Sequence, residues 1–141
     1  MLTLPTARAL KEAGLDWNAA KFDFFAVPER GLDEQVFVIT DMPAALATLQ
    51  GQTVVTFEGA MEWALDFVAA VEVIWLPTEA QLRAELAARL LTEPEANLTL
   101  RASADSCRCT FQFQGQALSF EAADGGEAYA AGLLAVLRSS S

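Results

Sequence analysis

The sequence predicts an α+β fold, and three observations lead to this prediction. The first half alternates short apolar runs with helix-like segments, which is typical of βαβ steps in a mixed sheet. Three one-sided strands then follow one another, as in an antiparallel β-meander. The last segment has one apolar stripe at helical spacing. The 141 residues suffice for a single domain, expected over 1–141 as a first half (1–91) and a second half (97–141).

The first half is expected to contain four helices and four strands. Residues 4–13 are predicted to form a helix because Thr3 can cap it and Gly14 can end it. The run at 35–40 is apolar on both faces, which predicts a central strand. Intervening helices make the later connections long enough for parallel crossovers. The other expected elements are strands at 22–27, 53–57 and 73–76, and helices at 42–50 and 59–71.

The helix that follows Thr78 has the clearest sequence signals. Thr78 and Gln81 have capping-box spacing, and leucines recur every four residues after them. Alternation of apolar and polar residues then predicts the strands of the meander, and Asp124 and Glu127 have capping-box spacing for a last helix. The expected ranges are strands at 98–102, 108–113 and 118–121, turns at 103–106 and 115–116, and a helix at 125–138.

The composition excludes several classes of function. The chain has no histidine, which removes Ser-His-Asp and Cys-His catalysis and His-ligated metal sites. Nine basic residues against nineteen acidic ones give a net charge of −10, so nucleic acid is a poor partner. No signal peptide is expected, and the longest uncharged stretch (42–57) is too short and polar to span a membrane. A cytoplasmic location is therefore expected.

Negative charge is concentrated in one part of the sequence. Residues 31–82 contain eight acidic residues and no Lys or Arg, so the segment has a charge of −8. A surface of one sign attracts basic partners at long range. The alternative interpretation is solubility, since acidic surfaces keep many proteins dispersed.

Five residues of this acidic segment are candidates for a binding surface. Glu58, Glu62 and Asp66 have i, i+4, i+8 spacing, so a helix would place them on one face. Such carboxylates can bind Mg²⁺ or Mn²⁺ or divide acid and base roles, or they can form a solvated helix face. Trp63 can anchor a ligand or partner, or pack in the core. Asp41 can join them if the strand ends converge there.

Cys107 and Cys109 lie two residues apart, so a strand places both thiols on one face. They can form a redox pair or half of a metal site, or act as two small apolar core residues. No second Cys or His pair completes a four-coordinate zinc site within one chain. We expect core residues here, with no bound metal and no cofactor.

Residues 9–83 resemble a family of small uncharacterised bacterial proteins. The motifs that carry this resemblance are A-L-K-E-A-G-L-D-W (9–17), P-E-R-G-L-D-E-Q-V-F-V-I (28–39) with Asp41-Met42, E-W-A-L-D (62–66) and W-L-P-T-E-A-Q-L-R (75–83). Some members are labelled pilus assembly proteins, but this sequence lacks the nucleotide-binding loop that a pilus-assembly ATPase needs. The resemblance implies one structural unit and no catalytic residues.

The sequence thus favours a non-catalytic cytoplasmic binding or regulatory module with an acidic face and a protein partner. One alternative is a Mg²⁺- or Mn²⁺-dependent hydrolase that uses the carboxylates at 58, 62 and 66. Another is an acidic inhibitor or immunity-type protein that binds a basic partner. A homodimer is also considered, through the leucine stripe at 82–90 or an exposed edge of the meander.

Overall fold

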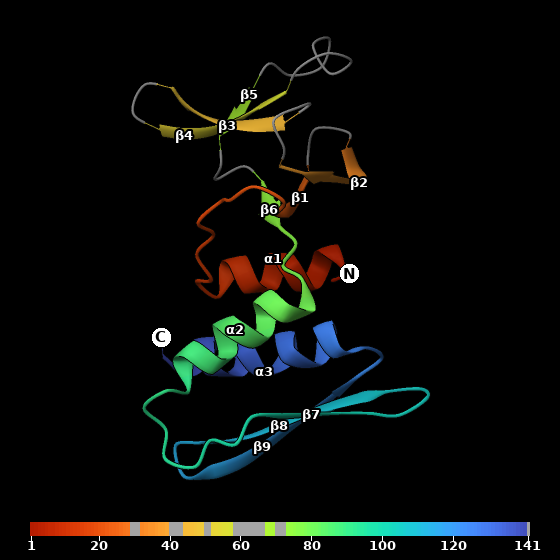
Figure 1. The fold of residues 1–141 in the computed structure, drawn as a ribbon, viewed down its shortest axis with the longest axis vertical. Helices are drawn as coiled ribbons and strands as arrows, with labels where there is room; N and C mark the ends of the chain where they lie inside the picture. The colour runs from red at the N-terminus through yellow and green to blue at the C-terminus, as the bar shows by residue number, and fades with distance from the viewer. Residues whose placement is uncertain (29–31, 40–43, 50–51, 58–66, 70–72, 141) are drawn as a thin grey trace. The chain divides into compact units, whose positions relative to one another are not determined.

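The structure is a computed structural model and describes residues 1–28, 32–39, 44–49, 52–57, 67–69 and 73–140 (Figure 1). The element order is α1 (Leu4–Glu12), β1 (Phe24–Val27), β2 (Leu32–Val38), β3 (Ala44–Leu49), β4 (Gln52–Phe57), β5 (Phe67–Ala69), β6 (Ile74–Trp75), α2 (Glu79–Arg89), β7 (Thr99–Ala102), β8 (Cys107–Phe113), β9 (Gln116–Ala122) and α3 (Gly125–Ser139). The predicted α+β class is confirmed, as is the meander followed by a C-terminal helix.

The chain divides into two compact units. Unit 1 comprises residues 1–15 and 77–141, and unit 2 comprises residues 16–76. Unit 2 is therefore inserted between α1 and α2 of unit 1. This boundary differs from the expected halves, because α2 was assigned to the first half but packs on α3. A single domain over the whole chain stays a prediction.

Unit 1 has a helical layer on one face of a three-stranded antiparallel sheet in the order β7-β8-β9. α3 contacts β8 and β9 directly and also packs on α2 and α1; Figure 1 shows α2 and α3 between the sheet and α1. Gly132 allows this close approach, because a Cβ there would lie 2.9 Å from Cε1 of Phe111. The buried residues of this core include Leu10, Leu82, Leu86, Cys109, Phe111, Leu133 and Val136.

Local signals in the sequence set several boundaries of unit 1. Both hydrogen bonds of the Thr78–Gln81 capping box are present at the start of α2. The β8–β9 turn is one residue earlier than predicted, at Gln114 and Gly115, which have φ of 52° and 77°. Positive φ at both central residues is typical of the tight turns that suit the twist of a hairpin.

The side chain of Glu127 joins α1 to α3. Asp124 caps α3 and accepts a hydrogen bond from the Glu127 N–H at 2.9 Å, as the capping-box spacing predicts. The Glu127 carboxylate, however, accepts from the Thr3 N–H at 2.9 Å and from the Thr6 hydroxyl at 2.8 Å. Thr3 is the N-cap of α1, so one carboxylate connects the starts of two helices that lie far apart in the sequence.

The described strands of unit 2 form two antiparallel sheets, in the orders β2-β1-β6 and β3-β4-β5. The predicted helix at 42–50 is wrong over 44–49, because these residues form β3 and pair with β4 from Ala44↔Phe57 to Leu49↔Gln52. Strand pairing here overrides the helix propensity of Ala and Leu. The predicted βαβ step between 40 and 53 is therefore wrong. The predicted helix at 59–71 gives way to β5 at 67–69, and the rest of that range lies outside the described residues.

The predicted central position of the 35–40 strand is also wrong. β1 is the central strand of its sheet, and β2 pairs with β1 alone among the described strands. Val36 on β2 is 49% exposed, although Phe37 packs against Phe25 on the other face. Although β2 has apolar residues on both faces, only the face that carries Phe37 is packed against the core.

We expect Glu127→Ala to destabilise unit 1 by about 1–2 kcal/mol, because it removes the charged acceptor of two donors at a partly exposed site. The described helices all belong to unit 1, whereas Trp17, Trp63 and Trp75 all lie in residues 16–76. Helix ellipticity therefore reports unit 1, and tryptophan fluorescence reports unit 2. In urea unfolding followed by helix ellipticity, the variant should therefore have a lower midpoint urea concentration than the wild type.

Glu12→Ala is the matched control, since it removes an exposed carboxylate from the same unit and should leave the midpoint unchanged. A double-mutant cycle between Glu127→Ala and Thr6→Val should give a coupling free energy of about 0.5–1.5 kcal/mol. A coupling of zero would contradict the proposed connection between α1 and α3.

Candidate functional site

The net charge of the chain lies almost entirely on unit 2. Residues 16–76 contain ten acidic and two basic residues, for a charge of −8. Unit 1 contains nine acidic and seven basic residues, for a charge of −2. The acidic segment seen in the sequence thus largely coincides with one compact unit.

Four aromatic side chains contribute to the described core of unit 2, beside buried Val27, Ile39 and Val73: Trp17, Phe25, Phe37 and Trp75. The rings of Trp17 and Trp75 are stacked at 6.4 Å with an interplanar angle of 9°, and Phe25 lies 5.5 Å from Phe37. Phe25 is fully buried. Trp17 and Trp75 therefore contribute to core packing; no described residue accepts a hydrogen bond from the buried Nε1 of Trp75.

Asp23 is a structural carboxylate of unit 2. Its side chain is only 6% exposed, and Oδ2 accepts from Trp17 Nε1 at 2.9 Å and from the Ala20 N–H at 3.0 Å. These bonds fix the segment that leads into β1 and orient the indole of Trp17. Because Asp23 is buried, its charge serves the fold of unit 2 and is not offered to a partner.

Phe22 combines an exposed aromatic ring with an unusual backbone. Its φ is 74°, and its side chain is 67% exposed. The Phe22 N–H donates to the Ile39 carbonyl at 2.7 Å, and the Ile39 N–H donates to the Asp23 carbonyl at 3.0 Å. Positive φ is strained for a bulky residue, at a cost of about 1–3 kcal/mol. Because the ring is exposed, its burial does not offset this strain, and Phe22 is therefore a candidate contact residue. The sequence predicts a strand at 22–27, whereas Phe22 lies just before β1.

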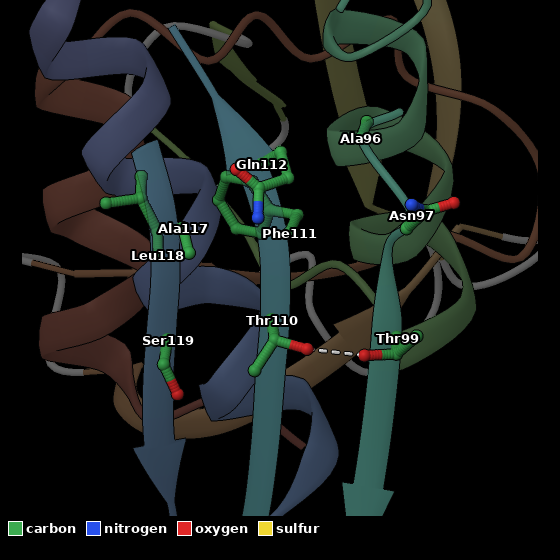
Figure 2. Close-up of a pocket in the computed structure, with 9 residues that line it drawn as sticks. All are labelled: Ala96, Asn97, Thr99, Thr110, Phe111, Gln112, Ala117, Leu118 and Ser119. Atoms are coloured by element: carbon green, nitrogen blue, oxygen red, sulfur yellow. Dashed lines mark hydrogen bonds between the residues drawn. The ribbon is translucent and has the colours of Figure 1, made fainter. Parts of the chain in front are cut away.

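The face of the meander opposite α3 carries a row of hydroxyl groups. Thr99, Thr110 and Ser119 stand opposite one another on the three strands (Figure 2). The Thr99 and Thr110 hydroxyls are hydrogen-bonded to each other. A shallow hollow of about 320 Å³ lies here, lined by Ala96, Asn97, Thr99, Thr110, Phe111, Gln112, Ala117, Leu118 and Ser119. The hollow therefore contains the hydroxyl groups of this row.

Arg108 and Glu121 on the same face form an ion pair across β8 and β9. Nη2 of Arg108 donates to Oε2 of Glu121 at 2.9 Å, and the Ser106 hydroxyl donates to Oε1 at 3.0 Å. The hydrogen bond from Arg108, assisted by Ser106, holds the pKa of Glu121 below its ordinary value. Arg101 stands opposite Arg108 on β7. This face is therefore slightly basic in an acidic chain.

A second hollow of about 350 Å³ lies in the helical layer of unit 1, lined by Glu79, Ala80, Arg83 and Tyr129. Burial raises the pKa of the Tyr129 phenol, and the nearby Cys109 adds to this effect. The phenol therefore stays protonated at neutral pH and acts as a hydrogen-bond donor or acceptor.

Cys107 and Cys109 are both free thiols, on the face of β8 that carries Phe111. Cys109 is fully buried, and burial raises its pKa to about 11. Cys107 is half-buried at the start of the strand. The core interpretation fits Cys109 well, because a buried protonated thiol is inert.

The five residues predicted to form the binding surface lie outside the described residues: Asp41, Glu58, Glu62, Trp63 and Asp66. Their role stays a prediction. The signals that the sequence analysis missed are the strained, exposed Phe22 and the hydroxyl row of the meander. The alternation of Thr and Ser with apolar residues marks that row, but nothing in the sequence marks a positive φ at a phenylalanine.

Comparisons of the chain with family models, with curated proteins and with solved structures find no match. In the part of the chain that the structure describes, no helix has the length and apolar character needed to cross a membrane.

We expect Cys109 to resist thiol reagents in the folded chain. In a Cys107→Ser variant at pH 8, a pKa near 11 leaves about one thiolate in a thousand, so labelling should be slow until the chain unfolds. Each added pH unit should raise the rate about tenfold. Equally fast labelling of the folded and unfolded variant would contradict the buried position.

Proposed function

We propose that the protein is a non-catalytic binding module for a basic protein partner and that residues 16–76 carry the binding surface. The observation that supports this proposal is the location of eight of the ten net negative charges on unit 2. Unit 1, with a net charge of only −2, serves as the scaffold into whose sequence this unit is inserted.

Long-range electrostatic attraction and short-range apolar contact both support this function. Charges on unit 2 attract a basic surface over about 10 Å at 0.1 M salt, which raises the association rate. Exposed apolar side chains then supply short-range contact, and in unit 2 Phe22 and Val36 are 67% and 49% exposed. Aromatic residues on a fixed backbone are typical anchors of protein interfaces.

The same chemistry supports an inhibitor or immunity-type role, in which the basic partner is a nuclease or toxin. We infer a cytoplasmic setting, which two free cysteines and the absence of a disulfide framework favour. The motifs at 9–83 are the basis for including the protein in the family of small bacterial proteins that it resembles.

Neutralising the acidic segment should weaken partner binding. The immobilised chain is incubated with a bacterial lysate at about 50 mM salt, and proteins released at about 0.5 M salt are identified by mass spectrometry. We expect a stoichiometric basic protein. Its affinity for Glu62→Gln/Asp66→Asn should fall about tenfold, which corresponds to about 1.4 kcal/mol.

The matched control is Glu12→Gln/Asp105→Asn, which removes the same charge from exposed positions of unit 1. It should bind the purified partner like the wild type. Equal binding by both double variants, or binding that does not weaken with salt, would contradict the proposal.

Phe22→Gly separates a binding role from a structural one. Glycine accepts a φ of 74° without strain and removes an exposed ring, so tryptophan-detected unfolding should show equal or higher stability. Calorimetry with the purified partner should show a loss of affinity of about tenfold or more. Lower stability together with unchanged affinity would overturn the assignment of Phe22 as a contact residue.

A further inference from the structure

β9 forms an open edge of the sheet in unit 1. All seven residues pair with β8, from Cys107↔Ala122 to Phe113↔Gln116, and no other described strand pairs with β9. An edge strand leaves alternate N–H and C=O groups free to pair with another strand. Of the usual protections β9 has a single charged residue, Glu121, and it contains no proline, no lysine and no bulge.

The other edge of the sheet is less suited to pairing. β7 has only four residues and carries the exposed charge of Arg101. The segment before it turns at Glu95 and Asn97, which both have positive φ. β9 is therefore the better template.

The inward face of β9 is incompletely covered. Phe120 is stacked on Phe111 at 5.9 Å on the face that α3 covers, but Phe120 and Leu118 are only half-buried. Among the described strands the sheet ends at β9, so none of them supplies apolar neighbours on that side of these two side chains. A strand with apolar residues at the same positions would complete the cover.

Charge favours a second copy of this chain as that strand. Unit 1 has a charge of only −2, against −8 for unit 2, so two copies of unit 1 repel each other weakly. The one charge on β9 is Glu121, and Arg108 already pairs with it. A basic partner is instead attracted to unit 2.

We propose that β9 pairs antiparallel with β9 of a second copy, about a two-fold axis at Ser119, to form a continuous six-stranded sheet. In this register Leu118 faces Phe120 of the partner subunit, and Ala117 faces Glu121 of the partner subunit. Apolar residues thus meet on the inward face, and no like charges meet on the outward face. Such a dimer presents two acidic units and can bind a repeated partner with avidity.

The oligomeric state tests this pairing. Sedimentation velocity at about 5 to 200 µM should give twice the 15.2 kDa mass of one chain as concentration rises. Ser119→Lys and Ser119→Glu each place like charges opposite each other at the axis, so each variant alone should be monomeric. An equal mixture of the two should form dimers, because lysine then faces glutamate.

Gln112→Lys is the matched control, since it adds a charge to the same face of the sheet but on the central strand. It should dimerise like the wild type. Concentration-dependent hydrogen-exchange protection of alternate β9 amides provides a second readout on the unmodified chain. The proposal would be overturned by a monomeric wild type, a dimeric Ser119→Lys variant or a monomeric mixture of the two Ser119 variants. A monomeric Gln112→Lys variant, or β9 amide exchange that does not change with concentration, would also overturn it.

Discussion

The Glu127 carboxylate connects the two ends of unit 1 across the inserted residues. α1 precedes unit 2 in the chain, and every other element of unit 1 follows it. Without a tertiary contact, α1 would be a nine-residue helix of marginal stability, since isolated helices of this length rarely persist in water. Buried Leu10 and the Glu127 bonds to Thr3 and Thr6 place it against α3. The long insertion is tolerated because the entropic cost of closing a loop grows slowly with its length.

The two units separate packing from charge. Unit 1 has nearly balanced charges, including the Arg108–Glu121 pair, and its core combines aliphatic residues with Cys109, Phe111 and Tyr129. Unit 2 has an excess of eight negative charges, and self-repulsion of like charges opposes compactness. Its described core contains buried Phe25, Val27, Ile39 and Val73 together with stacked aromatic rings, and Asp23 accepts hydrogen bonds from Trp17 and Ala20 beside it. This excess of negative charge does not help unit 2 to fold. The cost to folding therefore favours a binding role for the charge.

The accuracy of the sequence predictions follows the range of the interactions that decide each element. The capping box of α2 and the one-sided strands of the meander depend on neighbouring residues, and both are confirmed. β3 has the composition of a helix, and only its pairing with β4 decides otherwise. Glu127 was identified as a capping residue, but its tertiary partners Thr3 and Thr6 lie more than a hundred residues away. The predicted acidic site at 41 and 58–66 lies outside the described residues, whereas the strain at Phe22 leaves no trace in the pattern of residues.

The place of the insertion has a consequence for the surfaces of unit 1. The chain leaves unit 1 after Leu15 and returns at Pro77, which lie beside the ends of α1 and α2. Both junctions therefore belong to the helical layer, and neither belongs to the meander, whose strands follow one another without interruption. An insertion within a hairpin of the meander would have interrupted its regular pairing. Because β7, β8 and β9 are consecutive, the proposed partner recognition by unit 2 and the proposed pairing through β9 depend on separate parts of the sequence. Substitutions that change the charge of residues 16–76 can then leave the register of the sheet intact.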